Sequence, residues 1–158
     1  MIIALTINGQ DKQLRVEPGE NLLTVLRREG YFGVKNGCGE GDCGACTVLL
    51  DGQPVNSCLL LAVRVAGHKI TTIEGLGTPE QPHPLQLAFA EAGAVQCGYC
   101  IPGSILSSYA LLQRNPDPSD SQICDALDGN LCRCTGYVKK LDAIHRAAKL
   151  MAGEVRHE

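Results

Sequence analysis

Hydrophobic and polar side chains alternate at the start of the chain, in the pattern of a half-buried β-strand. Residues 2–7 keep this alternation up to Asn8-Gly9, a dipeptide that favours the tight turn of a β-hairpin. Residues 13–17 follow as the expected antiparallel partner. The pattern therefore predicts that the chain opens with a hairpin.

Closely spaced apolar residues then predict a short helix that ends at Gly30, because glycine readily adopts the backbone conformation that closes a helix. These apolar residues are Leu22, Leu23, Val25 and Leu26. After a loop rich in glycine and cysteine, a second hairpin is expected around the turn sequence Asp51-Gly52. The strands predicted in this part of the chain are residues 47–50, 54–58 and 69–73.

The pattern changes after residues 75–84, a stretch of glycine, threonine, proline and histidine that is typical of a linker. Apolar residues then recur with helical periodicity. The helices predicted are residues 85–92, 103–113, 122–127 and 138–151. We therefore expect an α+β protein with a strand-rich domain over residues 1–76 and an all-helical domain over residues 77–158.

The last predicted helix carries an apolar stripe on one face, which is most simply explained as a core-facing stripe. Its members are Val138, Leu141, Ile144, Ala148 and Met151.

Composition shows why two such domains would need additional stabilisation. The chain has 158 residues, 4% aromatic residues and no tryptophan, so each half would have a small aliphatic core. It also has nine cysteines, an odd number that excludes complete disulfide pairing within one chain.

The start of the chain has no basic segment of the kind that opens a signal peptide, and no apolar run approaches the length of a membrane span. We therefore expect a cytoplasmic protein, in which thiols stay reduced and cysteines more often bind metal than form disulfides. A net charge of −3 without basic runs argues against nucleic acid as a partner.

The first cysteine group is Cys38, Cys43, Cys46 and Cys58. Its C-x4-C-x2-C spacing with a distant fourth cysteine is typical of the plant-type 2Fe-2S site, in which four thiolates hold two irons and two sulfides. The four glycines near these cysteines, at positions 37, 39, 41 and 44, relieve the backbone strain of pointing three ligands inward. A structural zinc site and buried reduced thiols are the alternatives.

The second cysteine group is Cys97, Cys100, Cys132 and Cys134, on two segments of the helical half. Four thiolates in this pattern suit either zinc or a second iron–sulfur cluster. Pro102 is typical of the start of a helix, which is predicted there. The positive end of the helix dipole lies at that start and favours negative ligands such as thiolates.

The remaining candidates have simpler interpretations. Cys124 lies within a predicted helix and is expected to be a buried free thiol. The four histidines are not spaced with the cysteines as ligands of a Rieske-type centre would be, and His145 is expected at the surface or its boundary. Tyr99 and Tyr137 are expected to pack beside the two cysteine groups.

Three ordered segments resemble the iron–sulfur small subunit of the xanthine dehydrogenase (molybdenum hydroxylase) family, over nearly the whole chain. They are residues 37–48 (GCGEGDCGACTV), residues 96–100 (QCGYC) and residues 129–137 (GNLCRCTGY). Ile101 departs from the threonine that many members carry, which leaves every ligand in place. The resemblance implies a β-grasp ferredoxin-like domain and a four-helix domain, each with one 2Fe-2S cluster.

By the same resemblance, molybdenum on a pyranopterin lies in a partner large subunit and FAD in a partner medium subunit. Gln96 and Cys134 match the positions that contact the pterin. The chain would then be an electron-transfer subunit of an oxidoreductase complex, with no catalytic residue and no substrate turnover of its own. A free two-cluster ferredoxin that serves several partners is the alternative function.

Overall fold

The computed structural model describes residues 1–153, and His157 therefore lies outside the described residues. A five-stranded mixed sheet forms the N-terminal half, with strand order β2-β1-β5-β3-β4. Its strands are β1 (Ile2–Ile7), β2 (Gln10–Arg15), β3 (Thr47–Leu50), β4 (Gln53–Asn56) and β5 (Lys69–Thr71). Strand β5 pairs parallel to β1 and antiparallel to β3, and so joins the two hairpins into one sheet.

Both predicted hairpins are present, and their turns explain why. Asn8 and Asp51 have φ values of 50° and 49°, and the glycine after each also has a positive φ. This is the backbone geometry that lets a two-residue turn follow the twist of its strands. Strand β2 begins earlier than expected, since Gln10 already pairs with Ile7.

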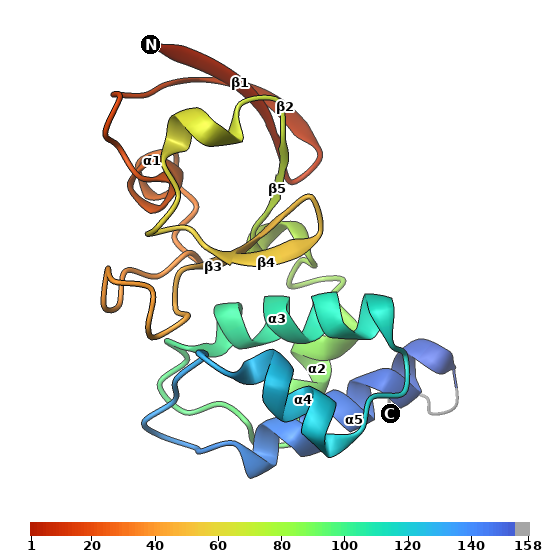
Figure 1. Ribbon diagram of the computed structural model, residues 1–158. Helices are drawn as coiled ribbons and strands as arrows, with labels where there is room; N and C mark the ends of the chain where they lie inside the picture. The colour runs from red at the N-terminus through yellow and green to blue at the C-terminus, as the bar shows by residue number, and fades with distance from the viewer. Residues whose placement is uncertain (154–158) are drawn as a thin grey trace.

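Helix α1 (Leu22–Arg28) packs its apolar side chains against the sheet, and Asn21 caps its first turn by accepting a hydrogen bond from the Thr24 amide. Four further helices form the C-terminal half. They are α2 (Pro84–Glu91), α3 (Ile101–Arg114), α4 (Asp120–Leu127) and α5 (Val138–Ala152). The expected α+β fold, with strands first and helices after, is confirmed (Figure 1).

Helix α3 runs along the side of the sheet that β3 and β4 form and holds the two halves together (Figure 1). Its buried face is built from small residues such as Ser104, Ser107 and Ala110, which permit a close approach of the backbone. Leu49 of the sheet packs with Leu106 and Ala110 of α3 in a core that bridges the halves.

The expected apolar stripe of α5 is wrong in part. Val138 is exposed and Met151 lies near the surface, whereas Ala143, Ile144 and Ala147 are buried. Helix α5 is therefore rotated about its axis relative to the expected stripe. The rotation places the third residue of the helix, Lys140, in the interior.

No helix within residues 1–153 is both long enough and apolar enough to cross a lipid bilayer.

Candidate metal centres

The first cysteine group is assembled from a loop and the end of a hairpin. Cys38, Cys43 and Cys46 lie in the segment between α1 and β3, and Cys58 follows β4. The loop backbone turns repeatedly through positive φ, with values of 75° at Gly39, 89° at Gly41 and 67° at Gly44. A side chain would strain each of these conformations, so glycine is what lets so short a loop carry three ligands.

The thiols of this group interact in pairs. The amide of Cys38 donates to Cys43 Sγ at 3.4 Å, and the amide of Glu40 donates to Cys38 Sγ at the same distance. The Cys46 and Cys58 side chains are neighbours and are buried, whereas Cys38 is exposed. One pair therefore faces the outside of the loop and the other faces the core.

The two pairs differ in how easily they ionise. Backbone N–H groups of Glu40 and Cys43 lower the pKa of the Cys38 thiol to about 7. Burial, together with the neighbouring Cys46 thiol, raises the pKa of Cys58 to about 11. A thiolate at Cys58 therefore requires added positive charge, which bound metal ions supply.

The second cysteine group joins two segments of the helical half. Cys97 and Cys100 precede α3, while Cys132 and Cys134 lie between α4 and α5. The side chains again interact as two pairs, Cys97 with Cys134 and Cys100 with Cys132.

Burial alone would raise the pKa of Cys132, but the Thr135 hydroxyl at 3.4 Å and nearby backbone N–H groups lower it to about 6. The pKa of Cys97 is lowered by the Tyr99 amide and by Cys134. The pKa of Cys100 is raised by burial, against the opposing effect of the Lys140 ammonium. Polar groups of the chain thus favour the thiolate at two positions of this group.

The pairwise arrangement fits a two-iron cluster. In a 2Fe-2S site each iron takes two of the four protein ligands, so the ligands form two pairs. The two pairs of thiols in each group therefore match the two pairs of ligands that such a cluster takes.

The two cysteine groups lie next to each other. The Leu131 amide, which precedes Cys132, donates to the carbonyl oxygen of Cys43 at 3.0 Å. The Tyr99 hydroxyl donates to the carbonyl oxygen of Asn36 at 2.6 Å. Hydrogen bonds therefore connect the two ligand loops directly.

Glycines permit this close contact between the halves. A Cβ atom at Gly103 would lie 2.2 Å from the Gly44 carbonyl oxygen and 3.0 Å from Asn130 Oδ1. A Cβ atom at Gly44 would lie 2.4 Å from the Gly129 carbonyl oxygen. The nearest obstacle at each glycine is a backbone carbonyl, which cannot rotate aside as a flexible side chain can.

We expect Gly103→Ala to destabilise the chain by about 1–3 kcal/mol, because overpacking at this site forces the backbones apart. The gain in helix propensity from alanine is smaller than this cost. Chemical denaturation of the metal-loaded chain measures the difference. Gly19→Ala is the control, since a Cβ atom there has nothing within 4 Å. Equal stabilities of the two variants would contradict the expected clash.

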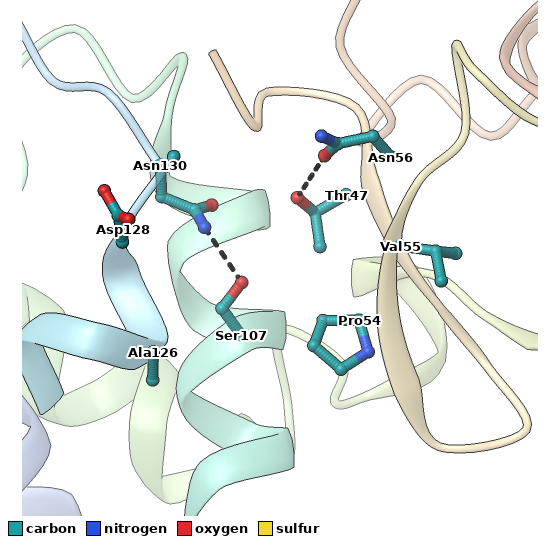
Figure 2. Close-up of a pocket in the computed structure, with 9 residues that line it drawn as sticks. Thr47, Pro54, Val55, Asn56, Ser107, Ala126, Asp128 and Asn130 are labelled. Carbon is teal, nitrogen blue, oxygen red and sulfur yellow. Dashed lines mark hydrogen bonds between the residues drawn. The ribbon is translucent and has the colours of Figure 1, made fainter. Parts of the chain in front are cut away.

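A cleft of about 190 Å³ opens between the halves beside this contact. Figure 2 shows Thr47, Pro54 and Asn56 on the sheet side and Ser107 and Asn130 on the helical side. Asn130 Nδ2 donates to Ser107 Oγ at 3.0 Å, while its buried Oδ1 has no hydrogen-bond partner within the described residues. The cleft is polar and lies at the contact between the halves.

The other predicted residues lie as follows. Gln96 is exposed and directly precedes Cys97. Tyr137 lies at the second cysteine group, where its hydroxyl accepts a hydrogen bond from the Cys132 amide at 3.1 Å. His145 is partly buried and pairs with Asp120 at 2.6 Å, as a boundary residue would.

The expectation for Cys124 is wrong. Its side chain is exposed, because the buried face of α4 is formed by Ile123 and Leu127. An eight-residue helix has room for few core-facing positions, and Cys124 falls outside them.

Lys140 is a further candidate that was not predicted from the sequence, and it is buried beside Cys100 and Ser104. One signal could have revealed it. Lys140 occupies the helical repeat that continues through Ala143, Ile144 and Ala147.

Comparison with known proteins agrees with this picture. Residues 5–68 match the family described as "2Fe-2S iron-sulfur cluster binding domain", and residues 72–145 match "[2Fe-2S] binding domain". The nicotinate dehydrogenase small FeS subunit of Eubacterium barkeri is 49% identical, and the match covers 95% of this chain and 96% of that protein.

Two solved structures extend the likeness. The quinoline 2-oxidoreductase structure from Pseudomonas putida 86 includes a chain that is 43% identical, with a TM-score of 0.91 and 98% of each chain covered. The aldehyde oxidoreductase of Desulfovibrio desulfuricans is 45% identical with a TM-score of 0.94, but the match covers 97% of this chain and only 17% of that one. There the matching part is one region of a much longer polypeptide. Fold, cysteine pattern and relatives together show that the chain belongs to the iron–sulfur (2Fe-2S) small subunits of the xanthine dehydrogenase, or molybdenum hydroxylase, family.

Proposed function

We propose that the chain transfers electrons between a molybdenum–pterin site in a partner large subunit and FAD in a partner medium subunit. The observation that carries this proposal is the direct connection of the two ligand loops through the Leu131–Cys43 hydrogen bond. Electron transfer between two centres requires a short gap, and this contact fixes one. Each 2Fe-2S cluster, when bound, supplies reversible one-electron storage.

In this proposal the first cysteine group holds one cluster and the second holds the other. The domain boundary falls between residues 76 and 77, so that each domain contributes one complete group. The amides of Cys38 and Glu40 orient the exposed pair of the first group, and the Thr135 hydroxyl does the same for Cys132. Such hydrogen bonds to sulfur stabilise the negative charge of the ligands.

The exposed residues at the second cysteine group indicate where the large subunit binds. Gln96, Cys97 and Cys134 are exposed together with the apolar side chains of Val95 and Leu131. Exposed apolar side chains around a functional group are typical of a surface that a partner covers. We place the pterin against Gln96 and Cys134, and FAD on the side of the first cysteine group.

The chain itself would turn over no substrate. The partner large subunit would oxidise an aldehyde or an N-heterocycle, the compound classes that appear in the names of the relatives. The ligand thiols must be reduced to bind iron, so a reducing compartment such as the cytoplasm suits this function.

Electron paramagnetic resonance of the dithionite-reduced chain tests the proposal, with iron and acid-labile sulfide counted on the same sample. We expect two distinct 2Fe-2S signals and about four irons per chain, two for each cluster. One signal with about half that iron would mean that the second cysteine group binds zinc or has a structural role, and holds no second cluster. A chain that copurifies with no other subunit would instead favour a freely diffusing ferredoxin.

A further inference from the structure

Lys140 is a charged residue in an interior position. Its side chain has 0% exposure, and its Nζ atom donates to Ser104 Oγ at 2.9 Å. The same Nζ lies 3.6 Å from Cys100 Sγ and 5.3 Å from the centre of the Tyr137 ring. The ammonium group is thus held between α3, α5 and the second cysteine group.

Burying an ammonium group without an anion is costly. None of the ion pairs within residues 1–153 includes Lys140, so no carboxylate compensates its charge there. The groups that face it are the Ser104 hydroxyl, the Tyr137 ring and the Cys100 sulfur. Of these, only the sulfur carries negative charge, when it is a metal-bound thiolate.

We propose that Lys140 is a positioning residue that raises the reduction potential of the cluster held by the second cysteine group, by directing its ammonium charge at the Cys100 sulfur. This inference rests on the proposed function, because it requires a cluster at that group. Ser104 would act through Lys140, since its hydroxyl oxygen fixes Nζ beside the sulfur.

The direction in which Lys140 shifts the reduction potential follows from the charge balance. One-electron reduction adds one negative charge to the cluster and its thiolates, and no bond forms or breaks. The electron comes from dithionite in the experiment below. Lys140 attracts the reduced, more negative form more strongly than the oxidised form, so its charge shifts the equilibrium towards reduction. The attraction is large because the group is buried and poorly screened by water.

Potentiometric titration of the full cluster-loaded chain, followed by electron paramagnetic resonance, tests the proposal with Lys140→Met. Methionine keeps an unbranched side chain of similar length and removes the charge. We expect the reduction equilibrium constant of the second cluster to fall about tenfold, equivalent to about 59 mV for a one-electron couple. The midpoint of the first cluster should stay unchanged. Loss of one signal in Cys134→Ser assigns the two signals to their clusters.

Lys139→Met is the matched control, because it removes the same charge from the neighbouring, exposed position of the same helix. It should leave both midpoints unchanged, since water and salt screen an exposed charge. Intact signals with equal midpoints in the Lys140→Met and wild-type chains would overturn the inference and leave the proposed function standing. A wild-type chain without a second signal would overturn both.

Lys140→Met removes one member of a buried charged contact, a change that can destabilise a protein. If that variant loses the second cluster, a measurement on the wild-type chain tests the contact instead. Pulsed electron paramagnetic resonance of chain labelled with 15N at the lysine ζ position should resolve a nitrogen coupling to the reduced second cluster. A spectrum identical to that of unlabelled chain would refute the contact between Lys140 and the cluster.

Discussion

In the assembled complex, Cys97→Ser is expected to stop substrate from reducing the first cluster. Cys97 pairs with Cys134 in the second cysteine group, so serine removes one of the four thiolates that hold the second cluster. Without that cluster, electrons from the large subunit would lack the intermediate centre through which they reach the first one. We expect substrate-driven reduction of the first cluster to fall to the level of a sample without substrate, as measured by rapid-mixing absorbance.

Two comparisons make this result interpretable. Cys124→Ser removes an exposed thiol of α4 that belongs to neither cysteine group, and it should behave as the wild type. Dithionite should still reduce the first cluster of Cys97→Ser, which would show that this cluster is intact. A native rate of reduction by substrate, in a variant shown to lack the second cluster, would mean that the proposed order of electron transfer is wrong.

Removing iron and sulfide is expected to unfold at least one half of the chain. The ligand segments are irregular backbone, with Cys38 to Cys43 in a loop between α1 and β3 and Cys132 and Cys134 in a loop between α4 and α5. Ligation therefore contributes directly to the free energy of folding. We expect the near-ultraviolet circular dichroism of the tyrosines and the cooperative thermal transition to be lost in the metal-free chain.

Hydrogen exchange can show which half unfolds when the metal is removed, because the amides of β1 and α5 belong to different hydrophobic cores. Chain carried through the same steps without chelator should keep both the signal and the transition. Reconstitution with iron and sulfide should restore them. A metal-free chain that melts cooperatively with a native-like tyrosine signal would show that the two small cores are sufficient for folding.

Much of the fold could be predicted because its signals are local. The Asn8-Gly9 and Asp51-Gly52 turns specify their hairpins through backbone conformations that few residues adopt readily. Periodicity distinguished the strand-rich half from the helical half, and the four predicted helices are present. Strand ends were less certain, because β2 begins opposite the end of β1, where Gln10 pairs with Ile7, and not where its own alternation begins.

The candidate metal sites were predictable in their residue types. Spacing alone identified the eight cysteines as two groups, since three ligands on one glycine-rich loop leave few other interpretations. Spacing could not say which thiols pair. The pairing of Cys97 with Cys134, across the segments that flank α3 and α4, depends on how the helices pack.

By itself, therefore, the sequence determined the two hairpins, the helical half, the two cysteine groups and the family. The rotation of α5, the exposure of Cys124 and the contact of Lys140 with Cys100 depend on tertiary packing. The physical reason is that helical periodicity places a charged residue on the solvent side by default. A buried lysine is stable only where other segments bring a hydroxyl and a sulfur to its ammonium group, and Ser104 and Cys100 come from a part of the chain 36 and 40 residues away.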